Sequence, residues 1–229
     1  FLMQAFIDKL DFHSYVAKQM FNLPVEVDKV KSVYPNERQY AKAITFGIMY
    51  QAGPAKIAET VNKDAREGEG ITSAQAKQFI GKYFGEAKKL KRFIDSSNQQ
   101  IESKQYIYSF FGRKRRLPEA KSPNRGVAQH AIRSGVNFLV QSVASDINVM
   151  GVIDLVKWIE NSGYDEAIKP FTVVHDSIVS EVREDLVEEY IKNAKECIQR
   201  DRGLTIPNCP IKVDFEVGPS WGELSDYEF

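Results

Sequence analysis

The chain has 229 residues with 31 basic and 31 acidic side chains, and its hydrophobic content of 43% is ordinary for a globular protein. Zero net charge excludes binding to nucleic acid by bulk attraction alone, so any such binding must come from local patches. No apolar run approaches the roughly 20 residues of a membrane span. Cys197 and Cys209 have no metal-binding or CxxC spacing, so we expect free thiols in a reducing, intracellular compartment.

The first half of the chain is predicted to be helical. Apolar periodicity indicates helices on both sides of DFHS (residues 11–14), which supplies capping groups. Because Pro35 favours an extended residue before it, a helix should start just after it and run to about Tyr50, where QAGP ends it. The later expected elements are a short helix at 56–62, a charged loop at 63–70, and one long or two shorter helices from Thr72 or Ser73, broken near Phe84 and Gly85.

The second half mixes helices and strands. Its expected elements are a β-prone aromatic run at 106–111, a basic cluster at 113–116, proline-marked coil, a long helix at 127–163, two strands within 168–182, a helix at 183–203 and a last strand within 210–221. The strands must pair antiparallel or non-locally. We therefore predict an α+β fold in two subdomains that meet near residue 115.

Four residues of the helix after Pro35 recur at a spacing of four: Arg38, Lys42, Phe46 and Tyr50. Such a spacing drifts slowly around a helix, and its rise of roughly 18 Å is the scale of a nucleoside triphosphate. Cations near a helix N-terminus favour phosphate, and aromatic faces favour a base or sugar. Gly47 leaves room for another backbone or a base. A surface helix with two solvated cations and two core rings would show the same spacing.

His175, Asp176 and Ser177 lie between two short apolar strands. A tight turn there would present a carboxylate as a rigid oxygen ligand for Mg²⁺. An ordinary hairpin with Asp at its turn would give the same pattern.

Polar residues also punctuate the long helix, where Arg133, Asn137 and Gln141 are spaced by four. If Asn137 and Gln141 are buried among their apolar neighbours, they need hydrogen-bond partners. The alternative is that they form the polar edge of an otherwise apolar helix. The basic cluster with Arg113 and Arg115 suits a phosphate backbone, although charged runs are usually solvated.

These motifs resemble family A DNA polymerases, the group of bacterial DNA polymerase I and many phage replicases. RQYAKAITFGIMY (38–50) is similar to the motif B helix, with Arg, three residues, Lys, three residues, Phe-Gly, two residues and Tyr. The resemblance implies that Arg38 and Lys42 bind the triphosphate of an incoming nucleotide and that Lys42 protonates the departing pyrophosphate. It also implies that Phe46 packs on the sugar and that Tyr50 closes on the nascent base pair or template.

The remaining motifs resemble other segments of that family. HDS resembles motif C, with Ser177 in place of the usual Glu, which implies that Asp176 is a catalytic metal ligand and that His175 lies near the primer terminus. Arg133, Asn137 and Gln141 match a palm-helix pattern that contacts the minor groove of DNA. FGRKRRLP, with Arg113 and Arg115, matches the segment leading into that helix. DFHS resembles Asp-Ile-His near the start of the fingers, which places His13 close to the phosphates.

By this resemblance the chain has the α+β right-hand polymerase architecture, with helical fingers at residues 1–115 and the C-terminal half of the palm, with a small antiparallel sheet, at 116–229. Its expected function is template-directed DNA synthesis, a nucleotidyl transfer from dNTP to a primer 3′-OH with two Mg²⁺ ions. Its partners would be DNA primer-template, dNTP and a missing N-terminal polymerase segment, without which we expect inactivity, since nothing here matches the motif A aspartate.

One Mg²⁺ ligand would therefore lie outside this chain. Glu181 and Asp214 are possible extra ligands, but both positions are typical of ordinary strand residues. The expected location is the cytoplasm of a bacterium or a phage-infected host cell, with no membrane partner. Two alternatives stay open: a fragment of a single-subunit RNA polymerase, and a non-catalytic nucleic-acid-binding subunit.

Overall fold

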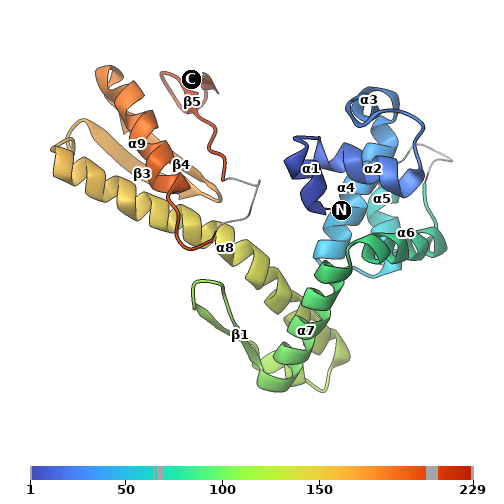
Figure 1. The fold of residues 1–229 in the computed structure, drawn as a ribbon. Coiled ribbons are helices and arrows are strands. Elements are labelled where there is room, and N and C mark those ends of the chain that lie inside the picture. Colours follow the sequence, from blue (N-terminus) through green and yellow to red (C-terminus); the bar gives the residue numbers. More distant parts are fainter. Residues whose placement is uncertain (1, 64, 66–69, 205–210, 228–229) are drawn as a thin grey trace. The chain divides into compact units, whose positions relative to one another are not determined.

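The computed structural model describes residues 2–63, 65, 70–204 and 211–227, and the chain divides into two compact units, residues 1–139 and 140–229. Helices dominate, and the strands of the described residues form small two-stranded antiparallel sheets (Figure 1). The predicted α+β fold is confirmed. Because the two units are defined by compactness alone, the predicted subdomain boundary near residue 115 stays a prediction.

The first unit is a set of short helices followed by a hairpin. Its elements are α1 (Leu2–Ile7), α2 (Phe12–Phe21), α3 (Val27–Val33), α4 (Pro35–Met49), α5 (Pro54–Lys63), α6 (Ser73–Glu86), α7 (Lys88–Lys104), β1 (Tyr106–Tyr108), β2 (Lys114–Arg116), the 3₁₀ helix η1 (Pro118–Lys121) and the first part of α8 (Arg125–Ser162).

Several of these helices begin at the residues that the sequence indicated. Asp11 caps α2 by accepting a hydrogen bond from the Ser14 amide, and Pro35 occupies the first turn of α4, where its missing N–H costs nothing. Thr72 and Gln75 form a reciprocal capping box at the start of α6. Local capping chemistry therefore sets where these helices start.

Three details differ from the sequence expectations. The segment between α2 and α4, for which no element was predicted, contains α3. The break between α6 and α7 falls at Ala87, beyond Gly85. The left-handed residue after α4 is Gln51, with φ of 53°, although the following glycine was expected to end the helix. A Cβ on Gly47 would lie 2.6 Å from Cγ1 of Ile57, so a side chain of α5 occupies the space beside this glycine.

The core of the first unit lies in two apolar clusters. One joins α2 to α6 through Val16, Ile44, Ile57 and Tyr83, and fixes α4 by its inward face. The other joins α7, β1 and α8, where Gly135 lets α8 approach closely, because a Cβ there would lie 2.5 Å from Leu117 and 2.6 Å from Ile101. Burial of one face of α4 leaves the opposite face available for chemistry.

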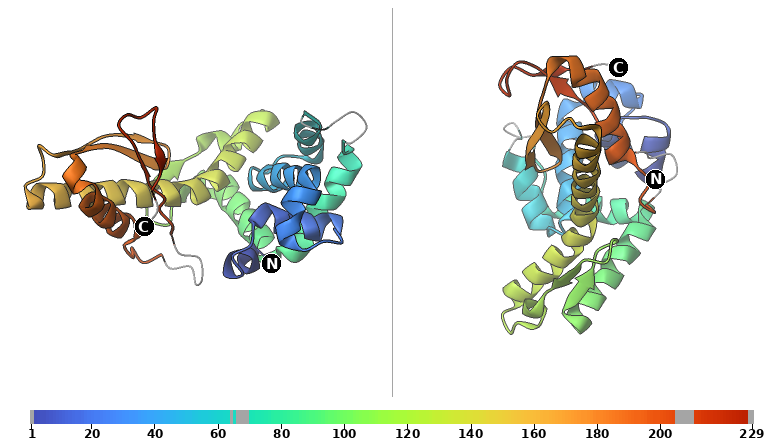
Figure 2. Two further views of the ribbon diagram at one scale, coloured as in Figure 1. Left: turned by 90° about the horizontal axis from the view of Figure 1, so that it is seen from above. Right: turned by 90° about the vertical axis from the view of Figure 1, so that its left-hand side faces the viewer.

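The second unit builds a hairpin and a helix alongside the end of α8 (Figure 2). Its elements are the rest of α8, β3 (Ile168–Val174), β4 (Ser177–Val182), the 3₁₀ helix η2 (Glu184–Leu186), α9 (Val187–Gln199), β5 (Glu216–Val217) and β6 (Ser225–Asp226).

The predicted hairpin is present, but Ser177 is the first residue of β4 and pairs with Val174, so the loop is His175 and Asp176, one residue shorter than expected. The core between α8, β3 and α9 includes Leu155, Ile168 and Cys197. Cys197 is a free, buried thiol whose pKa is raised by burial, and Cys209 lies outside the described residues.

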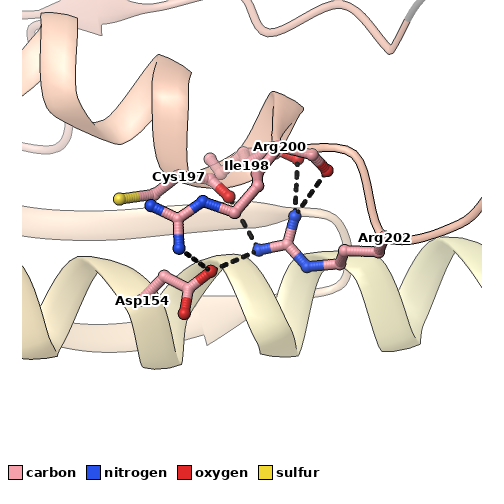
Figure 3. Close-up of polar contacts among 5 residues, drawn as sticks. All are labelled: Asp154, Cys197, Ile198, Arg200 and Arg202. Carbon is pink, nitrogen blue, oxygen red and sulfur yellow. Dashed lines mark hydrogen bonds and ion pairs between the residues drawn. The ribbon is translucent and has the colours of Figure 1, made fainter.

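An ion-pair cluster fastens the end of α9 to α8 (Figure 3). Arg200 Nη1 and Arg202 Nη2 both reach Oδ2 of Asp154, at 3.1 and 2.9 Å. Arg202 also donates to the carbonyl oxygens of Cys197 and Arg200, at 2.7 and 2.9 Å. Since the last carbonyls of a helix lack intrahelical partners, Arg202 satisfies groups that would otherwise need water. α9 consequently ends at Gln199, four residues earlier than Gly203, where we expected its end.

The C-terminal segment contains less strand than its sequence suggests. Among the described residues of the predicted strand, Glu216–Val217 pairs with Ser225–Asp226, and Asp214 lies outside any strand. Pro210 lies outside the described residues.

α8 is long and apolar enough to cross a membrane by length and mean composition, although polar residues such as Asn137 and Gln141 interrupt its apolar runs. This is weak evidence for a membrane span, because core helices of soluble proteins meet the same measure. Of its most apolar window, 28% is buried within the structure. α8 therefore leaves much apolar surface uncovered by the described residues.

Candidate functional site

The α4 stripe, defined as Arg38, Lys42, Phe46 and Tyr50, lies on one helix as predicted, with Tyr50 at its C-cap. Phe46 and Tyr50 are each 46% exposed, and their rings stack at 6.5 Å with an interplanar angle of 19°. The alternative of a surface helix whose two rings belong to the core is therefore wrong. The stripe instead presents two parallel ring faces outward beside its cations.

A hollow of about 330 Å³ borders the stripe. It lies between α4 and α5 and has mostly apolar walls with a cation at one side. Its lining residues are Gln39, Lys42, Ala43, Phe46, Gly47, Tyr50, Ala52, Ile57 and Thr60. Three of the four stripe residues therefore share one concave surface, which is the usual form of a small-molecule site.

The cations of the stripe differ in their partners. Arg38 donates from Nε to Oδ2 of Asp11 at 2.8 Å and from Nη2 to Oδ1 at 2.9 Å. This fork holds the pKa of Asp11 well below its usual range and raises the pKa of Arg38. Lys42 makes no hydrogen bond or ion pair with the residues that the structure describes. Its ammonium group is free to bind an anion.

His13 lies beside the stripe, on the first turn of α2. Its ring is 5.8 Å from the ring of Phe46, and its buried Nδ1 has no hydrogen-bond partner in the described part of the chain. Burial lowers the pKa of His13, and the cations of Arg38 and Lys42 lower it further, which keeps the imidazole neutral near pH 7. The predicted neighbourhood of His13, Arg38, Lys42 and Phe46 therefore exists within the first unit.

The hairpin tip in the second unit is held by two side chains. His175 takes a positive φ of 56°, the conformation that a two-residue loop requires at its first position and that costs a non-glycine residue about 1 kcal/mol. Ser177 Oγ donates to the Val174 carbonyl at 2.9 Å, and buried Asn148 donates from α8 to the His175 carbonyl at 3.4 Å. Asp176 is exposed at the tip, and no hydrogen bond or ion pair to it is found among the described residues.

One carboxylate does not make a metal centre. In the described ranges of the chain, no three His, Cys, Asp or Glu side chains gather into a group that could hold a metal ion. Asp176 is therefore not joined by Glu181 and Asp214 in a closed set of ligands. What Asp176 offers is a free pair of oxygens, which suits Mg²⁺ in sites where the other ligands come from phosphates, water and a further carboxylate.

The residues predicted to contact DNA lie on β2, its preceding turn and α8. Arg115 donates to Ser134 Oγ at 2.6 Å, and the guanidinium groups of Arg113 and Arg115 lie over the ring of Phe138, at 5.4 and 5.5 Å. The basic cluster is thus anchored on α8 rather than merely solvated. Arg133 and Asn137 on α8 are half-buried. Gln141 is exposed on the same helix, in the second unit.

Two residues of these sites were not identified from sequence. Asp11 was expected only to help cap a helix, because nothing in the spacing of 27 residues indicates its fork with Arg38. Asn148 resembled any polar residue of a long helix, and its role depends on the fold bringing the hairpin next to α8.

Comparison with known proteins assigns the chain to a family. The model of DNA polymerase family A matches residues 1–223. The chain is 46% identical over 212 residues to the DNA polymerase of Escherichia phage T5, covering 89% of this chain and 25% of that protein. It is 29% identical over 222 residues to DNA polymerase I of Pseudomonas aeruginosa, covering 97% and 22%.

A solved structure has a similar fold. The structure described as the POL domain of Pol1 from M. smegmatis, in complex with DNA primer-template and dNTP, superposes with a TM-score of 0.74 at 27% identity, covering 86% of this chain and 32% of that one. The chain spans about a quarter of the length of the two curated relatives. Since the family match extends over nearly all of its residues, the chain belongs to DNA polymerase family A.

Proposed function

We propose that this chain supplies the fingers (residues 1–115) and the C-terminal half of the palm (116–229) of a template-directed DNA polymerase. It transfers a deoxynucleotidyl group from dNTP to a primer 3′-OH. The observation that carries the proposal is the α4 stripe, which joins an unpaired ammonium group and two exposed rings beside one hollow. Membership of family A supports DNA synthesis as the activity.

The stripe separates two tasks along one rigid helix. Arg38 and Lys42, with neutral His13 beside them, bind the triphosphate by charge and hydrogen bonding. Phe46 packs on the sugar, and Tyr50 closes on the nascent base pair or the template. Because a helix holds these groups at fixed spacing, nucleotide binding also places the α-phosphate for attack, which accounts for much of the rate enhancement in phosphoryl transfer.

The reaction is an in-line displacement at phosphorus. The primer 3′-oxygen forms a bond to the α-phosphorus and loses its proton, while the bond from the α-phosphorus to the bridging oxygen breaks. The leaving group is pyrophosphate, and the Lys42 ammonium donates a proton to that group. No oxidant or further reactant is required.

Asp176 would hold Mg²⁺ in this reaction together with a carboxylate that lies outside this chain. Its exposure at the hairpin tip and its free oxygens fit that role. A single carboxylate supplies only one of the protein ligands that the ions need, so a second one must come from elsewhere. When bound, the ions neutralise charge on the phosphates and on the attacking oxygen. Ser177 adds no carboxylate; its hydroxyl fastens the turn that presents Asp176.

The remaining polar groups bind the primer-template. Arg113 and Arg115 contact the phosphate backbone, and Arg133, Asn137 and Gln141 contact the minor groove, where the acceptors are alike in every correct base pair. His175 lies near the primer terminus. Contacts of this kind bind DNA with little preference for sequence, as a polymerase requires.

The rest of the polymerase covers the apolar face of α8. Val149, Ile153 and Val156 recur at helical spacing and are 51%, 47% and 36% exposed. The curated relatives are about four times as long as the matched segment. The additional residues of such a longer polymerase would cover this face. The chain alone is then inactive, and it works in the cytoplasm of a bacterium or a phage-infected cell.

The test is a chimera in which this chain replaces the matching segment of the phage T5 DNA polymerase. Primer extension with dNTP should proceed in the chimera. Asp176→Asn should lower it by about a thousandfold, whereas Asp165→Asn, an exposed carboxylate of the same unit, should leave it unchanged.

Two outcomes would contradict the proposal. Equal extension rates for Asp176→Asn and the unsubstituted chimera would indicate a binding-only role for this segment. Preference for rNTP over dNTP would indicate an RNA polymerase.

A further inference from the structure

Three interactions of the first unit meet at the Asp11 carboxylate. Oδ2 accepts hydrogen bonds from the Ser14 amide at 2.8 Å and from Arg38 Nε at 2.8 Å, and Oδ1 accepts one from Arg38 Nη2 at 2.9 Å. The first bond caps α2, and the other two reach α4. One side chain therefore fixes the start of the helix that carries His13 and the first cation of the α4 stripe.

The fork leaves one side of the guanidinium group open. Arginine has five N–H donors in a plane, and Asp11 takes one from Nε and one from Nη2. No described residue accepts a hydrogen bond from Nη1 of Arg38. The free edge, which carries Nη1, can still form hydrogen bonds to a phosphate while the opposite edge stays on Asp11.

The carboxylate is well placed to stay ionised and in position when a phosphate arrives. It is held by the α2 N-terminus as well as by Arg38, and the arginine side chain is only 22% exposed. A phosphate that displaced Asp11 would have to break two charge-assisted hydrogen bonds, whereas a phosphate on the open edge breaks none. Sharing the guanidinium group is therefore less costly than competing for it.

We propose that Asp11 is a positioning residue for triphosphate recognition, holding Arg38 by one edge so that the other edge faces the phosphates. This inference rests on the proposed nucleotide-binding role of the α4 stripe. Because Asp11 also caps α2, it fixes the position of Arg38 relative to His13, two residues further along that helix. The buried Nδ1 of His13 has no partner among the described residues. The carboxylate thus sets the relative placement of two groups that bind one ligand.

Asp11→Asn separates the two jobs of this carboxylate. Asparagine caps a helix about as well as aspartate, so α2 should stay intact and the unfolding temperature should change little. Its amide can no longer accept both arms of the fork. Binding of inorganic triphosphate and of dTTP to the 229-residue chain, measured by calorimetry, should weaken about tenfold, a loss typical of a charge-assisted hydrogen bond.

Asp8→Asn is the matched control, because this nearby exposed carboxylate accepts hydrogen bonds from Gln4 and from no other side chain that the structure describes. Its triphosphate affinity should equal that of the unsubstituted chain. In an Arg38→Lys background, where no fork forms, Asp11→Asn should cost less than about twofold.

Each other outcome overturns the proposal. Tighter triphosphate binding by Asp11→Asn would mean that Asp11 competes with phosphate, and unchanged binding would mean that it only caps α2. Lys42→Ala distinguishes this failure from that of the proposed function: if Lys42→Ala weakens binding and Asp11→Asn does not, only the role of Asp11 fails. If the unsubstituted chain binds no triphosphate, both fail.

Discussion

Arg38 and Lys42 are carried by a 15-residue helix with its inner face buried, whereas Asp176 stands on a two-residue loop between strands. The helix fixes the spacing of its side chains by its own geometry, and its partners come from the same unit. The loop depends on Ser177 and Asn148 to hold it, and its carboxylate lacks companions in the described residues. The proposed nucleotide-binding surface thus lies within one unit, whereas the proposed metal site needs ligands beyond those that the described residues bring together.

The two regions should also respond differently to substitution. Changes to the α4 stripe should act on the nucleotide, since Lys42, Phe46 and Tyr50 border the hollow. Changes at the hairpin should act on the rate of the chemical step, because Asp176 offers a ligand rather than a binding surface. The experiments below test this difference, from the largest expected effect to the smallest, in the chimera with the phage T5 enzyme.

Apart from Asp176→Asn, the largest effect is expected for Lys42→Ala. Loss of the unpaired ammonium removes both the proposed phosphate contact and the proposed proton donor for pyrophosphate, so kcat/KM for dNTP should fall by about a hundredfold or more. Steady-state primer extension measures this. Lys77→Ala, an exposed lysine on α6, is the control and should keep full activity. Equal losses in both variants would show that general charge, and not the stripe, is responsible.

A smaller effect is expected for Asn148→Ala. It removes the donor to the His175 carbonyl and loosens the turn, so the maximal extension rate should fall about tenfold while KM for dNTP stays the same. Ser142→Ala on the same helix is matched to it, because the Ser142 hydroxyl is buried with no partner in the described chain and can be removed without loss. A change in KM instead of the rate would place Asn148 in nucleotide binding.

The smallest effect concerns the first region alone and is a pH dependence. The pKa of His13 is lowered in the folded state by burial and by Arg38, so below about pH 6.5 the unfolded chain binds more protons. Stability should therefore fall as the pH is lowered through that value. His13→Asn should remove this part of the dependence, so that its unfolding temperature falls less between pH 7 and 5.5 than that of the unsubstituted chain. Parallel pH curves for both proteins would contradict the assignment.

The sequence predicted features that depend on local rules. Pro35, Thr72 and the DFHS cap set the starts of their helices. The spacing of the α4 stripe places its four side chains on one face as soon as that segment is helical. The hairpin around Asp176 followed from two β-prone runs that a polar pair separates. These predictions hold because each depends on residues within one or two turns of each other.

What the sequence could not predict depends on distant segments. The Asp11–Arg38 fork and the Asn148 contact each join residues 27 apart, and no local pattern marks them. Gly47 was expected to admit a backbone or a base, yet its space is filled by Ile57 of the next helix. The early end of α9 depends on Arg202, which reaches back to carbonyls and across to Asp154. In each case tertiary packing selected one of several local possibilities.

The most direct test of the division between the two regions is single-turnover nucleotide incorporation by the chimera, measured by rapid quench over a range of dNTP concentrations. Arg38→Ala should weaken the apparent dNTP affinity about tenfold or more. Asp176→Asn should lower the maximal rate about a thousandfold and change that affinity less than about threefold. An Asp176→Asn enzyme with an unchanged maximal rate would contradict the account.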